Sequence, residues 1–92
     1  ADPARDTKMT KLYQQAYFLE IQGLEEKNNL KEALAEYQNF SKQNPNSELN
    51  EKAVWNAMQL QFKIGDAFNG SKTALEFASR YPKSDQSTNA LL

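Results

Sequence analysis

A short proline-containing phrase occurs twice in the chain, 37 residues apart, and this repetition constrains the fold more than any other feature. Residues 43–48 read QNPNSE and residues 80–85 read RYPKSD. Because proline disfavours helical geometry in the residue before it, each phrase is expected to end a helix. The serine of each phrase is a good N-cap, and the acid behind it suits the start of the next helix. The two phrases therefore predict two equivalent joints between helices.

The segments around these joints have the apolar spacing of three and four that is typical of amphipathic helices. Asn28-Asn29 and Gly65-Asp66 interrupt the pattern, and Asn and Gly tolerate the left-handed conformation in which helices often end. No segment alternates apolar and polar residues with a period of two, so no strand is expected. The sequence predicts an all-α fold with helices at about residues 9–26, 30–42, 48–64 and 67–80, and a fifth helix that begins near residue 85.

A shift of 37 residues also aligns the interiors of these helices. The aligned pairs are Leu12 with Leu49, Ala16 with Ala53, Phe18 with Trp55, Ile21 with Met58, Phe40 with Phe77 and Pro45 with Pro82. We therefore expect antiparallel helix-pair repeats, that is, about two repeats plus a terminal helix. The expected organisation is repeat one at about 9–45, repeat two at about 47–82 and a terminal or capping helix at 84–92. Residues 1–8 are expected to be a disordered segment or a cloning remnant.

These residues resemble the tetratricopeptide repeat (TPR) family, in which two antiparallel helices carry a large residue early, a small residue in the second helix and a proline near the end. The first repeat matches the pattern with Tyr17 or Phe18, Ala33, Tyr37, Phe40 and Pro45, and the second with Trp55, Gly65-Asp66, Gly70, Ala74, Phe77 and Pro82. The resemblance implies a TPR-like α-solenoid. The phrases AEYQNFSKQNPNS and ALEFASRYPKS resemble a bacterial envelope subgroup, the type of the outer-membrane assembly lipoprotein BamD and of the division coordinator that works with the Tol-Pal system.

Composition excludes several classes of function. The net charge of −1 argues against nucleic acid as the main ligand, because phosphate binding needs a concentrated basic surface. The absence of Cys and His removes thiolate metal sites and the commonest general base, so we expect no enzyme activity, no metal and no cofactor. No apolar run approaches the roughly 18 residues of a membrane span, so no direct membrane insertion is expected.

In TPR proteins the concave surface is lined mainly by the first helix of each pair, and the resemblance implies a partner-binding surface there. Polar side chains recur on one face of the third helix, and the 37-residue shift places a matching stripe on the first helix. Amides can both donate to and accept from an extended peptide backbone, and aromatic rings can serve as anchors. The alternatives are that the aromatic residues are buried between helices and that the polar stripe is only a solvated face. The candidate partner-binding residues are Gln15, Phe18, Gln22, Lys52, Trp55, Asn56, Gln59 and Lys63.

The resemblance implies a protein–protein interaction scaffold that binds a peptide or a partner protein, in the periplasm or otherwise associated with the cell envelope. A cytoplasmic location is the alternative. The alternative function is self-association as an oligomerisation module of a larger TPR protein, suggested by the apolar Ala90-Leu91-Leu92 segment and by the exposed apolar end of a short array.

Overall fold

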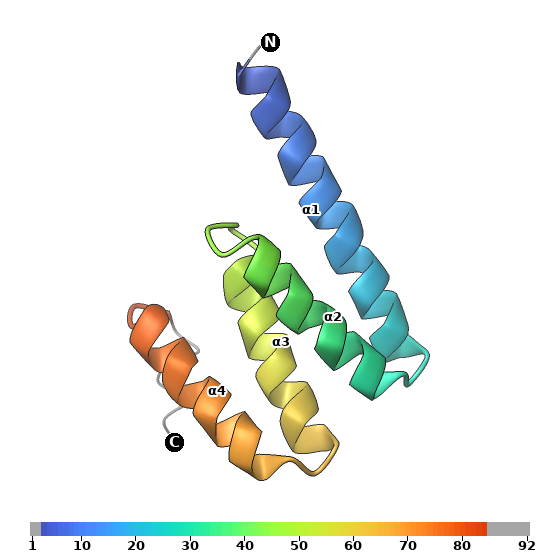
Figure 1. Cartoon of the computed structure of the whole chain (residues 1–92), viewed down its shortest axis with the longest axis vertical. Coiled ribbons are helices and arrows are strands. Elements are labelled where there is room, and N and C mark those ends of the chain that lie inside the picture. Colours follow the sequence, from blue (N-terminus) through green and yellow to red (C-terminus); the bar gives the residue numbers. More distant parts are fainter. Residues whose placement is uncertain (1–2, 85–92) are drawn as a thin grey trace.

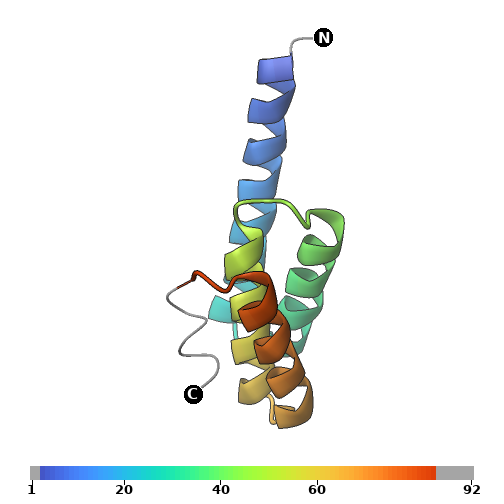
Figure 2. The same ribbon diagram turned by 90° about the vertical axis from the view of Figure 1, so that its left-hand side faces the viewer.

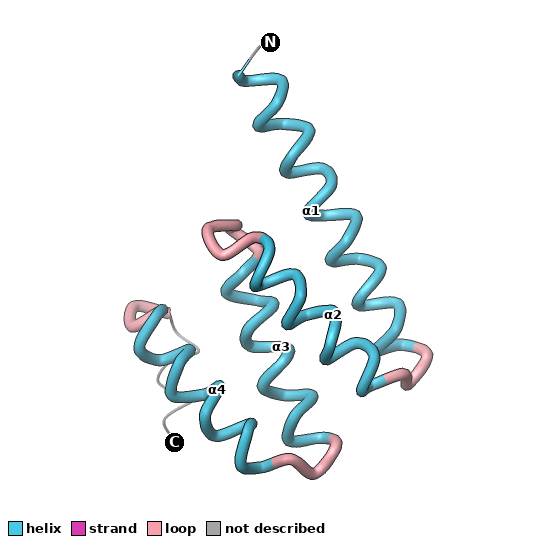
Figure 3. The backbone as a smooth tube through the Cα atoms, in the orientation of Figure 1, coloured by secondary structure: helices cyan, strands magenta, loops and turns pink. Residues whose placement is uncertain are grey.

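The structure, a computed structural model, describes residues 3–84, with side chains described from Asp6 onward. Within these residues four helices follow one another, and each runs antiparallel to the next (Figure 1). No strand occurs within the described range, which confirms the predicted all-α class. Figure 3 shows that only short turns connect the helices, which are α1 (Pro3–Glu26), α2 (Leu30–Gln43), α3 (Asn50–Lys63) and α4 (Ala67–Arg80).

The α1–α2 and α3–α4 turns are built alike. Asn28 has φ 64° and Gly65 has φ 87°, a left-handed conformation that glycine adopts freely and asparagine at low cost. Each turn then closes with a backbone hydrogen bond over six residues, the pattern of a Schellman motif. These bonds run from Asn29 N–H to Leu24 C=O (2.9 Å) and from Asp66 N–H to Gln61 C=O (2.8 Å), so donors and acceptors are both offset by 37 positions.

The ends of α2 and α4 show the same offset. Both helices stop just before a proline, and the capping residue donates its N–H to a phenylalanine carbonyl four positions back. The next turn closes with a second shared bond, donated by the serine of each proline phrase. The four bonds are Asn44 N–H to Phe40 C=O (2.9 Å), Tyr81 N–H to Phe77 C=O (2.8 Å), Ser47 N–H to Asn44 C=O (3.1 Å) and Ser84 N–H to Tyr81 C=O (3.1 Å).

Helix α1 begins earlier than expected, at Pro3 and not near Met9. Residues 3–8, which we assigned to a disordered segment or a cloning remnant, form its first turns. Proline suits the first position of a helix, and Asp6 adds an acid to the first turn. Residues 1–2 and the expected terminal helix beyond Ser84 lie outside the described residues.

The N-terminal half of α1 projects past the other three helices (Figures 1 and 2), which gives the molecule extents of 45 × 32 × 18 Å. Only the C-terminal half of α1 therefore packs against α2. The apolar residues Met9, Leu12, Tyr13 and Leu19 remain 42–70% exposed, although the periodicity placed them on the same amphipathic helix as Ile21. None of the helices in the described range is both long and apolar enough to cross a membrane.

The main core lies where α1, α2 and α3 meet, and large rings from α1 and α2 fill it. Ile21, Tyr37 and Phe40 are fully buried there. A second group of side chains joins α3 to α4, where the ring of Phe77 lies 5.3 Å from the rings of both Trp55 and Tyr81. The buried residues of the main core are Phe18, Ile21, Ala33, Tyr37, Phe40, Ala53, Ala57 and Leu60.

Candidate functional site

A groove of about 580 Å³ lies between α1 and α3, the first helices of the two helix pairs. We call it the α1–α3 groove. Seven of the eight predicted partner-binding residues line it, although they come from segments more than 25 residues apart in the sequence. These seven are Gln15, Phe18, Gln22, Lys52, Trp55, Asn56 and Gln59.

The eighth predicted residue, Lys63, is not part of this lining. It occupies the last turn of α3, where its side chain is exposed. A basic side chain there complements the helix dipole. The periodic stripe on α3 therefore continues past the point where α1 faces it.

The two predicted aromatic residues differ in their roles. Phe18 is 6% exposed, and its ring centroid lies 5.6 Å from Tyr37 and 5.9 Å from Phe40. It is mainly a core residue and gives the groove only its small exposed fraction. Trp55 is partly exposed and packs against Phe77, so it presents a larger aromatic surface to the groove.

Asn56 is held by a residue of the core. Its Nδ2 donates a hydrogen bond of 3.2 Å to the hydroxyl of Tyr37, a fully buried side chain of α2. Burial, followed by the charge of Glu25, raises the pKa of Tyr37 to about 12. The phenol is therefore protonated at neutral pH and remains able to donate.

The other amides of the groove have no such partner. Within the described part of the chain, Gln15, Gln22 and Gln59 form no hydrogen bond through their side chains, and Gln15 and Gln59 are exposed. Lys52 is also exposed and is the one charged residue among the groove's described lining. The groove thus offers free amides, one cation and an aromatic surface.

Two apolar residues of the groove were not among the predicted site residues. Leu19 is 65% exposed, and Leu49 is partly buried against the main core. The 37-residue shift pairs Leu19 with Asn56, so Leu19 belongs to the predicted stripe on the first helix although it was not proposed as a binding residue. The shift also pairs Leu12 with Leu49, which could have marked Leu49. Leu19 and Leu49 give the groove more apolar surface than the predicted residues alone.

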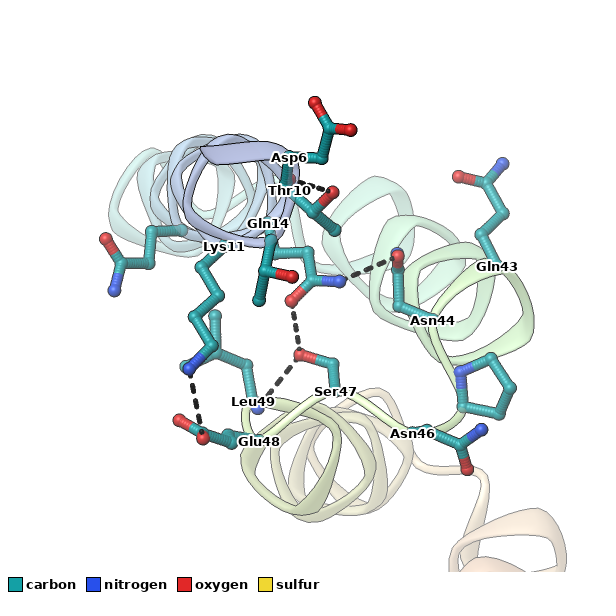
Figure 4. Close-up of a pocket in the computed structure, with 13 residues that line it drawn as sticks. Asp6, Thr10, Lys11, Gln14, Gln43, Asn44, Asn46, Ser47, Glu48 and Leu49 are labelled. Carbon is teal, nitrogen blue, oxygen red and sulfur yellow. Dashed lines mark hydrogen bonds and ion pairs between the residues drawn. The ribbon is translucent and has the colours of Figure 1, made fainter. Parts of the chain in front are cut away.

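A second hollow of about 560 Å³ adjoins the groove, sharing Gln15 and Leu49 with it (Figure 4). It lies between the start of α1 and the α2–α3 loop. Gln14 spans this hollow, because its Nε2 donates to Asn44 Oδ1 at 3.2 Å and its Oε1 accepts from Ser47 Oγ at 2.9 Å. Both ends of the Gln14 amide are therefore occupied, and it serves as a bridge between α1 and the loop.

Ser47 was predicted to be the N-cap of the third helix, but Leu49 holds that position and no side chain caps α3. The Oγ of Ser47 instead accepts a hydrogen bond of 3.1 Å from Leu49 N–H, just before the helix. The helix itself begins at Asn50, two residues later than the sequence suggested, because a turn of residues 47–50 comes first. Within that turn, Glu48 forms an exposed ion pair with Lys11 of α1 at 3.6 Å.

The described residues hold no group of three or more acidic side chains placed to bind a metal ion. Comparison of the chain with known protein families, curated proteins and solved structures finds no match.

Proposed function

We propose that this chain is a TPR-like interaction module that binds an extended peptide segment of a partner protein in the α1–α3 groove. Two helix pairs with backbone hydrogen bonds offset by 37 residues support the repeat assignment. The resemblance to envelope TPR proteins supports a place in a periplasmic or cell-envelope complex.

One observation carries the proposal: a single groove gathers side chains that are equivalent under the 37-residue shift. Gln15 and Lys52 form one such pair, and Gln22 and Gln59 form another. The two polar side chains of α1 and the two of α3 therefore have the same spacing along their helices. An extended peptide offers donors and acceptors at regular intervals, so it can pair with free amides of this kind. The cation of Lys52 favours an acidic side chain in the bound segment.

The test uses Trp55 as a built-in reporter, because it is the only tryptophan and it lines the groove. Peptides selected from a random phage-displayed library against the whole chain are expected to change its fluorescence. Gln59→Ala should weaken their binding about 3- to 10-fold, the effect of one hydrogen bond. Gln38→Ala is the matched control, since Gln38 is an exposed glutamine of α2 outside the groove. Failure to select any peptide, or equal effects of the two variants, would contradict the proposal.

Self-association is a second candidate function, favoured by the apolar side chains that α1 leaves exposed. Met9, Leu12 and Leu19 are 42%, 62% and 65% exposed, and with Ala16 they recur every three or four residues on a helix that only partly packs on its neighbours. Such a stripe is typical of helix pairing. If it pairs two copies, light scattering should give a dimer mass that Leu12→Glu converts to a monomer mass. A monomer of the unsubstituted chain at high concentration would rule this out.

A further inference from the structure

A buried tyrosine of the core links α1 to the groove. The charge of Glu25 acts on the Tyr37 hydroxyl, and that hydroxyl accepts a hydrogen bond from the Asn56 side chain. Each of the three residues comes from a different helix, α1, α2 and α3 in turn. Asn56 alone among these three also lines the α1–α3 groove.

The chemistry of the three groups decides which way the Asn56 amide points. The negative charge of Glu25 acts on the Tyr37 hydroxyl, which favours a hydroxyl proton that points toward α1 and an oxygen that accepts from Asn56. Asn56 turns its Nδ2 toward Tyr37, at 3.2 Å. Its Oδ1, on the other branch of the amide, makes no hydrogen bond to the described residues.

We propose that Tyr37 is a positioning residue that holds Asn56 Oδ1 as a fixed hydrogen-bond acceptor for a backbone N–H of the bound segment. This inference rests on the proposed function and specifies its ligand. The segment must carry a free backbone N–H opposite Asn56, so a proline or an N-methylated residue is excluded at that one position.

The same arrangement separates Asn56 from the other amides of the groove. Among the residues that the structure describes, Gln15, Gln22 and Gln59 have no partner that orients them, so each can present either its oxygen or its nitrogen. Asn56 offers its acceptor before the ligand arrives, which lowers the ordering cost of binding. Its equivalent under the 37-residue shift is the exposed Leu19. The groove therefore presents an apolar contact beside α1 and a fixed acceptor beside α3, which favours an apolar side chain close to the recognised N–H.

The first measurement needs no ligand. In an ¹H–¹⁵N spectrum of the whole chain, the two side-chain NH₂ protons of Asn56 should have well separated chemical shifts. The proton that is hydrogen-bonded to Tyr37 should exchange slowly with water. In Tyr37→Phe the chemical shifts of both Asn56 side-chain protons should move to the values of an exposed amide such as that of Asn46. The matched control is Tyr17→Phe, because Tyr17 packs on Phe40 but donates its hydroxyl to Glu36, at 2.8 Å and outside the groove. An Asn56 amide that already resembles that of Asn46 in the unsubstituted chain would overturn the proposal.

The second measurement uses a phage-selected peptide, synthesised with one backbone N-methyl group at each position in turn. One methylated position should weaken binding to the unsubstituted chain about tenfold or more, because the bound peptide then covers Asn56 Oδ1 without donating a hydrogen bond to it. For the variants Tyr37→Phe and Asn56→Leu, the same N-methyl group should weaken peptide binding less than about threefold. For Tyr17→Phe it should weaken binding as much as for the unsubstituted chain.

The outcomes separate this inference from the proposed function. If no peptide is selected, both are overturned. If peptides bind but no N-methyl penalty depends on Tyr37 and Asn56, the proposed function stands and the inference is wrong. If Tyr37→Phe fails to fold, the inference is tested by comparing how much the N-methyl group weakens peptide binding to the unsubstituted chain and to Asn56→Leu.

Discussion

At the scale of single residues, Gly70 and Phe62 show how a glycine in a helix interior can be retained by packing. Gly70 is buried in the first half of α4, where alanine would be the better helix former by about 1 kcal/mol. A Cβ at this position would lie 2.9–3.0 Å from three atoms of the Phe62 ring. Its equivalent in the first helix pair is the buried Ala33. The ring of Phe62 thus occupies the space that a methyl group fills in the first pair.

We predict that the effect of Gly70→Ala on the free energy of unfolding depends on Phe62. In the unsubstituted chain the gain in helix propensity should be largely offset, because the Phe62 ring must move to make room for the new methyl group. In a Phe62→Ala background, Gly70→Ala should stabilise the protein by about 1 kcal/mol relative to Phe62→Ala alone. Urea unfolding of the four proteins measures this coupling. An equal effect of Gly70→Ala in both backgrounds would show that the close approach does not restrict this position.

At the scale of secondary-structure elements, the sequence predicts best where an end is set locally. The bounds of α4 agree with the prediction and those of α2 differ by one residue, because Asn28, Gly65 and the two prolines stop or start helices through their own backbone preferences. The start of α1 was missed because residues 3–8 lack apolar periodicity. The described side chains of this segment, those of residues 6–8, are exposed, so these residues are helical as a continuation of the α1 backbone.

Burial along each element was harder to predict, because it depends on which neighbour covers it. Leu12 and Ile21 have the same apolar character, yet Leu12 is 62% exposed and Ile21 is fully buried, since only one half of α1 faces α2. Periodicity predicts which residues share a face but not how far the partner helix extends. For the same reason the stripe on α3 included Lys63, which lies outside the groove.

Polar groups in the interior were the least predictable part of the site. Tyr37 was recognised as a repeat residue, but its bond to Asn56 joins two helices through side chains 19 residues apart. No local pattern encodes that pairing. The groove residues themselves were predictable because the 37-residue shift relates two stripes that face one another.

At the scale of the whole molecule, Asn50 connects the end of the first helix pair to the end of the second. It is fully buried, and its Nδ2 donates to the Pro45 carbonyl at 3.1 Å and to the Tyr81 hydroxyl at 2.8 Å. Arg80 donates to the same Pro45 carbonyl. Pro45 belongs to the α2–α3 loop, whereas Arg80 and Tyr81 end α4. An asparagine near a helix start usually faces solvent, so the sequence did not indicate this role.

We predict that Asn50→Ala destabilises the protein by about 1–3 kcal/mol, because a buried donor to two acceptors is lost. Asn46→Ala is the matched control: Asn46 lies in the same loop but is exposed, and its replacement should change the free energy of unfolding by less than about 0.5 kcal/mol. The Asn50 effect should also be local. Hydrogen exchange should accelerate in residues 44–50 and in the last turn of α4, while the amides of the α1–α2 turn keep their protection. Equal stability losses for the two variants would mean that Asn50 does not join the helix pairs, and a uniform loss of protection would mean that all four helices unfold as one unit whichever contact is removed.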